Sequence, residues 1–137
     1  MRYLLDTNVC IDVMRGREEV IAQLRSMSPD DCAISSVSMF ELEAGAHKSR
    51  DPQAELQKVS LLCDTMSVLA WNESAAKAAA RIRMDLETDG RKIGAYDTLL
   101  AGHALALGLV WVTDHVKEFT RVEGLLLENW RSRELGL

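Results

Sequence analysis

The sequence predicts an α/β protein, a three-layer α/β/α sandwich with a short-stranded, mainly parallel sheet. Short apolar runs of three or four residues alternate along the chain with longer segments of helical periodicity. Most of these runs lack strict alternation of apolar and polar residues, which is typical of strands covered on both faces. Strands that alternate with helices form parallel sheets with right-handed crossovers, and this gives the predicted class.

The apolar runs are the predicted strands, and they comprise residues 3–5, 32–34, 67–69, 109–112 and 125–127. Segments with helical spacing lie between them. One ends at Pro29, and the next begins at Pro52 with Asp51 as its predicted N-cap. A further helix is predicted over about residues 72–90. The last, over about residues 96–107, has almost no polar face and is expected to be buried.

Length and composition indicate one ordinary globular domain. The chain has 137 residues, of which 47% are hydrophobic, so it can bury a proper core and is not expected to be disordered. We expect the domain to span residues 1–130, with a tail at 131–137. The net charge of −5 argues against a protein that grips nucleic acid by bulk positive charge.

The cysteine count and the lengths of the apolar runs favour a cytoplasmic location. Three cysteines, an odd number without a CxxC pair, favour a reducing environment over a disulfide framework. The longest uncharged apolar run, residues 104–112, is about half as long as a membrane span requires. We therefore expect a cytoplasmic protein without a membrane partner.

Acidic residues stand where sites form in open α/β sheets, outside the carboxyl ends of the strands. Asp6 follows the first predicted strand and Asp114 the fourth, while Glu41 lies in the segment 35–42 and Asp97 at the start of the predicted helix over about residues 96–107. A cluster of carboxylates suits Mg²⁺ or Mn²⁺ rather than zinc, because these hard cations prefer oxygen ligands. A bound dication would let an acidic protein hydrolyse phosphodiesters.

Each acid also has a purely structural interpretation, and position alone leaves the choice open. Asp6 can cap a helix that begins near Asn8, and Ser38 with Glu41 has the spacing of a capping box. Asp97 would be stabilised by a helix macrodipole, and Asp114 is an ordinary turn residue.

The four acidic segments in this order resemble a PIN domain, specifically the VapC-type toxins of bacterial toxin–antitoxin pairs. The resemblance extends from Met1 to Trp130. Its motifs are LLDTN around Asp6, ISSVSMFELEAG around Glu41, IGAYDTLLAGHA around Asp97, and VTDHVKEF followed by VEGL and ENW. Each motif is weak alone, whereas four in order are specific.

This resemblance implies a Mg²⁺-dependent endoribonuclease, with Mn²⁺ as a substitute, that cuts tRNA or other structured RNA and leaves 5′-phosphate and 3′-hydroxyl ends. It also implies a homodimer and a cognate antitoxin whose C-terminal segment occupies the active-site groove. By motif match the catalytic residues are Asp6, Glu41, Asp97 and Asp114, with Asp6 and Asp97 as metal ligands. The donors expected to orient them are Thr7, Asn8, Ser36 and Thr113.

One departure from the family pattern concerns the fourth acidic position. Relatives commonly carry Asn or Asp where this chain has His115, and Asp114 lies one residue earlier. The sequence leaves open which of the two fills that role, and whether one or two ions bind.

The basic residues Arg91 and Lys92 are candidate RNA contacts. A catalytically silent PIN-like module that binds a protein or RNA is the alternative function.

Overall fold

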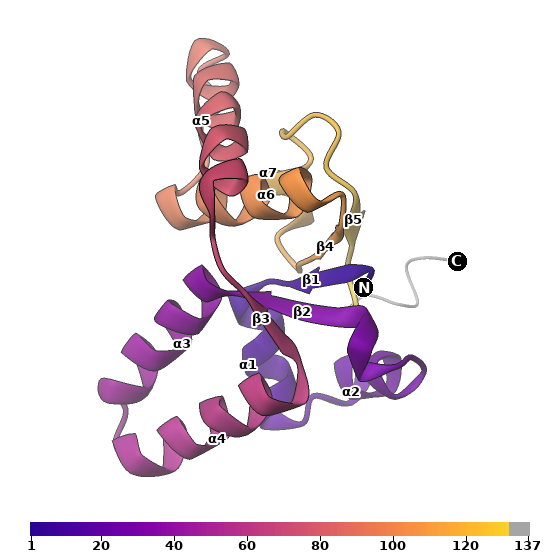
Figure 1. Ribbon diagram of the computed structural model, residues 1–137, viewed down its shortest axis with the longest axis vertical. Coiled ribbons are helices and arrows are strands. Elements are labelled where there is room, and N and C mark those ends of the chain that lie inside the picture. The colour runs from indigo at the N-terminus through magenta and orange to yellow at the C-terminus, as the bar shows by residue number, and fades with distance from the viewer. Residues whose placement is uncertain (132–137) are drawn as a thin grey trace.

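The computed structural model describes residues 1–131 as a five-stranded, all-parallel sheet flanked by helices. The sheet has the order β3-β2-β1-β4-β5 (Figure 1). Its strands are β1 (Tyr3–Leu5), β2 (Cys32–Ser35), β3 (Ser67–Leu69), β4 (Val110–Val112) and β5 (Leu127–Glu128). This confirms the predicted fold class.

Seven α-helices lie in the described part of the chain, and a short 3-10 helix, η1 (Pro29–Asp31), precedes β2. They are α1 (Thr7–Arg15), α2 (Glu18–Arg25), α3 (Ser36–His47), α4 (Pro52–Thr65), α5 (Glu73–Thr88), α6 (Ala95–Leu107) and α7 (Val116–Phe119). In Figure 1, α3 and α4 form a hairpin on one side of the sheet, and α5 projects away from the other side next to α6.

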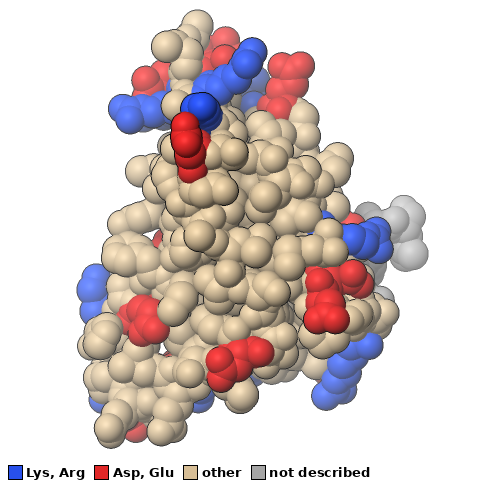
Figure 2. Space-filling model, in the orientation of Figure 1, with Lys and Arg blue, Asp and Glu red and all other residues tan. Residues whose placement is uncertain are grey.

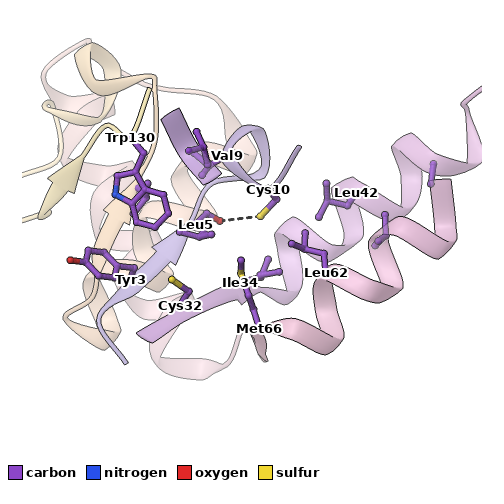
Figure 3. Packing of buried hydrophobic residues seen from close by; sticks show 14 residues of the cluster. Tyr3, Leu5, Val9, Cys10, Cys32, Ile34, Leu42, Leu62, Met66 and Trp130 are labelled. Atoms are coloured by element: carbon purple, nitrogen blue, oxygen red, sulfur yellow. Dashed lines mark hydrogen bonds between the residues drawn. The ribbon is translucent and has the colours of Figure 1, made fainter. Parts of the chain in front are cut away.

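Successive residues of the central strands enter two different cores, which is why the strands read as continuous apolar runs. Tyr3 and Leu5 of β1 pack on one face, together with Val9, Leu62 and Trp130 (Figure 3). In that close view the indole of Trp130 stands over the Tyr3 ring, at 5.6 Å between ring centroids. Strands β2 and β4 add Cys32, Ile34 and Val112, and helices α1, α2, α3 and α4 contribute most of the other side chains of this core.

The intervening residues supply the second core. Leu4 of β1 and Trp111 of β4 contact Leu100 and its neighbours on α6, with α5 and α7 completing the layer. Trp111 is fully buried against Phe119 in an edge-to-face arrangement, at 5.6 Å between ring centroids. The sheet is therefore sandwiched between two helical layers.

The order of the strands creates the switch point at which sites form. From β1 the chain adds β2 and then β3 on one side, and later returns to add β4 and β5 on the other. The carboxyl ends of β1 and β4 are therefore neighbours, and Leu5 pairs with Val112. The residues that follow these two strands leave the sheet side by side.

The structure corrects the predicted elements at the C-terminal side. Strand β5 is Leu127–Glu128, so the predicted run 125–127 begins too early, and β4 begins at Val110 rather than at residue 109. Strand β5 has only two residues, which are too few for a periodic pattern to locate it. The predicted tail at 131–137 lies outside the described residues except for Arg131.

The predicted helix starts agree with the structure, but the first predicted helix ends earlier than expected, because α2 ends at Arg25 and Pro29 begins η1. Asp51 caps α4, with its side chain accepting a hydrogen bond from Ala54 N, and Pro52 is the first helical residue.

Cys10, Cys32 and Cys63 are free thiols, as expected. None of the helices within residues 1–131 combines the length and the apolarity that a membrane crossing needs.

The contact between α5 and α6 requires a glycine at position 102. A Cβ atom built on Gly102 would lie 2.6 Å from the backbone and Cβ of Ala79, which no side-chain rotation can relieve. The two helix backbones therefore approach at their smallest residues, Gly102 and Ala79.

We predict that Gly102→Ala lowers the free energy of unfolding by about 2 kcal/mol or more, because an overpacked backbone contact must separate. Gly45→Ala is the matched control. Gly45 is also helical but has open space around its Cβ position, so alanine there should be neutral or stabilising by up to about 1 kcal/mol. Urea unfolding of both variants measures the difference, and equal stabilities would contradict the assigned packing.

Candidate active site

Asp6 lies at the switch point, directly after β1, and is only 4% exposed. Its backbone N–H continues the β1–β4 pairing by donating to Val112 O at 2.9 Å. Thr113, the first residue after β4, donates its hydroxyl to Asp6 Oδ2 at 2.7 Å. The pairing of β1 with β4 therefore places the buried Asp6 carboxylate next to the Thr113 hydroxyl that orients it.

Burial makes the Asp6 carboxylate expensive to ionise. Desolvation is the main reason that its pKa rises from 3.8 to about 6, and repulsion by Asp97 acts in the same direction. The Thr113 hydrogen bond opposes the increase without cancelling it. A buried carboxylate with a raised pKa and a second acid nearby is typical of a functional site.

Asp97 reaches the same site from α6, where it is the third helical residue. Its pKa is raised, first by burial and then by the charges of Glu41 and Glu118, while His115 acts in the opposite direction. Gly94 lies next to this carboxylate, since a Cβ built at that position would lie 3.4 Å from Asp97 Oδ2. The charges of acids on two other helices, α3 and α7, therefore act on Asp97.

Glu41 is held in the site by Thr7. The Thr7 hydroxyl donates to Glu41 Oε1 at 2.7 Å, and it also lies 3.0 Å from the hydroxyl of buried Ser38. Thr7 opens α1, whereas Ser38 and Glu41 lie within α3. This contact joins the segments that follow β1 and β2.

The loop after β4 places His115 at the rim of the site. Thr113 fixes the loop a second time, because its hydroxyl accepts a hydrogen bond from His115 N at 3.0 Å. The imidazole Nε2 lies 2.9 Å from Asn8 Nδ2, and Nδ1 lies 3.4 Å from a carboxylate oxygen of Glu118. The predicted donor Asn8 therefore contacts His115.

Asp114 is engaged elsewhere. Its Oδ2 pairs with Arg131 Nη1 at 2.7 Å, and its buried Oδ1, which lies 3.6 Å from His115 Nε2, has no hydrogen-bond partner among residues 1–131. The same guanidinium binds both oxygens of buried Asp12, at 2.6 and 2.8 Å. Nothing local in the sequence pointed to this triad, which connects residues 12, 114 and 131. The catalytic role of Asp114 stays a prediction.

The remaining predicted residues lie at the periphery. Ser36 accepts a hydrogen bond from Trp71 N at 2.9 Å, so its contact joins the start of α3 to the segment after β3. Arg91 and Lys92 are exposed in the loop before α6, and Arg121 anchors that loop by donating to Lys92 O at 3.3 Å. Both basic side chains remain candidates for contact with RNA.

The structure corrects two of the structural alternatives. Asp6 occupies the N-cap position of α1, but its side chain makes no capping hydrogen bond. The N-cap of α3 is Ser35, which accepts from Val37 N at 3.1 Å, so Ser38 and Glu41 do not form a capping box. Their spacing has another cause, because residues three apart on a helix face the same neighbour, here Thr7.

The donor set fits a divalent cation bound largely by water. Asp6 and Asp97 repel each other, and a cation between them would remove that repulsion. Within the described residues, no three His, Cys, Asp or Glu side chains are already grouped closely enough to hold a metal. Mg²⁺ is commonly bound by one or two carboxylates together with water and substrate phosphate, so two carboxylates suffice.

Comparisons with known proteins agree with this geometry. The PIN domain family model matches residues 3–125. The tRNA(fMet)-specific endonuclease VapC of Shigella flexneri is 35% identical over 130 residues, covering 95% of this chain and 98% of that protein. The structure of DNA-bound VapBC from Salmonella typhimurium contains a chain with a TM-score of 0.90 at 34% identity, covering 95% of this chain and 98% of that one.

A third similarity is to VapBC2 from Rickettsia felis bound to a promoter DNA fragment, with a TM-score of 0.89 at 30% identity and coverage of 95% and 99% of the two chains. A parallel α/β sandwich with acids at its switch point is the architecture of a PIN domain. The chain belongs to the PIN domain family and is a nuclease of the VapC type. Nucleases of this family generally depend on divalent metal ions.

The raised pKa of Asp6 predicts a pH-dependent stability. Because the folded-state pKa of about 6 exceeds the ordinary 3.8, the folded protein holds an extra proton between these values, and stability falls as pH rises through this range. We expect Asp6→Asn to stabilise the metal-free protein near pH 8 by up to about 3 kcal/mol, and hardly at all near pH 4. Urea unfolding in chelator measures this, with exposed Asp85→Asn as control. A pH-independent difference would contradict the burial argument.

Arg131 is predicted to stabilise the fold. Arg131→Ala leaves Asp12, which is 5% exposed, without its partner, and should cost about 2–3 kcal/mol. Arg17→Ala removes an exposed pair with Glu19 and should cost less than about 1 kcal/mol. A chain that ends at residue 130 lacks the same guanidinium and should lose at least as much stability as Arg131→Ala. Thermal melts compare these proteins; full stability of the chain that ends at 130 would instead support the predicted domain boundary.

Proposed function

We propose that this chain is a cytoplasmic, Mg²⁺-dependent endoribonuclease toxin that hydrolyses RNA to 5′-phosphate and 3′-hydroxyl ends. The observation that supports it is that Asp6, buried at the switch point, lies near enough to Asp97 on α6 for the Asp97 charge to raise the pKa of Asp6. Mn²⁺ is expected to substitute for Mg²⁺, because both prefer oxygen ligands. The proposed substrate is tRNA or another structured RNA, which agrees with the name of the Shigella relative.

Asp6 and Asp97 would hold the ion, which when bound supplies positive charge to the attacking and leaving oxygens. Thr113 keeps the Asp6 carboxylate fixed by donating to Oδ2. Thr7 holds Glu41 at Oε1, so Oε2 is the oxygen that can accept a proton from the attacking water. Water adds to phosphorus, the bond from phosphorus to O3′ breaks, and that oxygen takes up a proton.

An antitoxin partner is part of the proposal. Carboxylates that repel each other attract a guanidinium as well as a metal ion, and arginine can bind a carboxylate through two nitrogens. Arg131 already binds Asp12 in this way within the chain. We propose that the C-terminal segment of a cognate antitoxin enters the groove and pairs with the site acids, and that the toxin is a homodimer. The similar structures from Salmonella typhimurium and Rickettsia felis are of VapBC, which supports the antitoxin partner.

We predict that Asp6→Asn and Asp97→Asn each lower RNA cleavage at least 100-fold, about the cost of losing one electrostatic catalytic group. Cleavage of total tRNA in Mg²⁺, with end-labelled fragment mapping, measures this, and chelation should abolish the wild-type activity. Circular dichroism checks that both variants fold, and exposed Asp85→Asn should cut normally.

Cleavage at the wild-type rate by Asp6→Asn would remove that residue from the mechanism. Absence of cleavage by the wild-type protein in Mg²⁺ and Mn²⁺, together with RNA or protein binding, would instead favour the catalytically silent module. A Mn²⁺-induced thermal shift that Asp97→Ala abolishes distinguishes a genuine metal site from that alternative.

A further inference from the structure

Two aromatic side chains next to the site are exposed and touch each other. Phe40 on α3 is 56% exposed and Tyr96 on α6 is 47% exposed, with ring centroids 5.9 Å apart and planes inclined by 39°. The buried aromatic residues, in contrast, are at most 5% exposed: Tyr3, Trp111, Phe119 and Trp130. Core packing therefore does not account for the Phe40–Tyr96 pair.

The position of Phe40 on its helix confirms that it faces away from the core. Ser38, Leu42 and Ala46 form the buried stripe of α3, at intervals of four residues. Phe40 lies two residues from both Ser38 and Leu42, about 200° around the helix. An apolar ring on that side gains nothing from the core.

Each ring directly precedes a site acid. Phe40 is followed by Glu41, and Tyr96 by Asp97, so the ring-bearing and acid-bearing Cα atoms are about 3.8 Å apart. Glu41 and Asp97 are themselves electrostatically coupled. The aromatic pair thus bridges α3 and α6 beside the two carboxylates.

We propose that Phe40 and Tyr96 form a platform on which an unpaired base of the RNA substrate stacks beside the bond that is cut. This inference rests on the proposed ribonuclease function and adds to it how the substrate is held. Bases splayed from RNA loops are commonly bound by stacking on aromatic side chains. Such stacking favours unpaired nucleotides over duplex, because only an unstacked base exposes both faces.

The charge of the protein explains why such a platform is needed. The net charge is −5, and Figure 2 shows acidic and basic side chains scattered over the visible face, without a continuous basic stripe among the described residues there. The site itself is acidic and repels phosphate until a cation binds. Stacking supplies affinity that does not depend on phosphate charge.

A protein partner fits the pair less well than a base does. Fully buried aromatic side chains cover about 150–250 Å² each, so two of them fall well short of the about 800 Å² per partner of a stable protein interface. A single base, in contrast, needs only the face of an exposed aromatic ring in order to stack. Arg91 and Lys92, a few residues before Tyr96, are placed to contact the adjoining phosphates.

The test uses Phe40→Ala, Tyr96→Ala and the double variant in the full-length protein. Leu107→Ala is the matched control, since Leu107 is 45% exposed at the opposite end of α6. Binding is measured by fluorescence anisotropy in Mg²⁺ with a labelled single-stranded 12-nucleotide RNA and the corresponding duplex, in the Asp97→Asn background. Cleavage of total tRNA is measured without that substitution.

We expect the double variant to bind the single strand about 10-fold to 100-fold more weakly, with duplex binding little changed, and to raise KM more than it lowers kcat. Phe40→Leu with Tyr96→Leu keeps apolar surface without rings and should show the same loss. Phe40→Tyr with Tyr96→Phe keeps the rings and should restore binding. The Leu107→Ala control should be unaffected.

Three outcomes would overturn the platform. These are unchanged single-strand binding and KM in the double variant, full restoration by leucine, or loss of the dimer in sedimentation equilibrium, which would assign the pair to a contact between protein chains. Because binding is assayed separately from cleavage, failure of the nuclease proposal can be distinguished from failure of the platform. RNA binding that depends on the rings without any cleavage supports the platform and rejects only the catalytic assignment.

Discussion

Leu5 pairs with Val112 in the register of β1 and β4, so Asp6 and Thr113 emerge side by side from the middle of the sheet. The hydroxyl of Thr113 then bonds the Asp6 carboxylate and, as an acceptor, the backbone of His115. A slip of one residue in this pairing would turn Thr113 to the other face of the sheet. The geometry of the site therefore depends on how these two strands are paired.

Carboxylate repulsion links the proposed activity to its proposed inhibition. The fold buries Asp6 near Asp97 at a cost in stability, which appears as raised pKa values. Any cation that enters between them recovers that cost. A metal ion with its water shell and an antitoxin guanidinium would therefore compete for the same electrostatic gain, and an inhibitor that brings positive charge needs no separate binding pocket.

The sequence was most informative where function follows locally from a strand end. Asp6 comes directly after an apolar run, so the rule for parallel sheets located it. The same rule selected Asp114, which pairs with Arg131, whereas Thr113 was named only through the family resemblance. Glu41 was ambiguous, because spacing within one helix indicated a capping box while its partner Thr7 lies 34 residues away. The Arg131 pair with Asp12 spans 119 residues and has no local pattern, so only the folded chain reveals it.

Hydrophobic patterning has a related limit at α3 and α6. Helix α6 is apolar on nearly all sides, which predicts burial and gives no sign of which apolar residue remains exposed, and α3 mixes serine and glutamate with its apolar residues. The structure separates these roles by position along the helix: residues near the middle of α6, such as Leu100 and Ala104, fill the core, whereas Tyr96 in its first turn reaches the rim beside Asp97. An apolar helix that points one end at a site can thus serve the core and the substrate together.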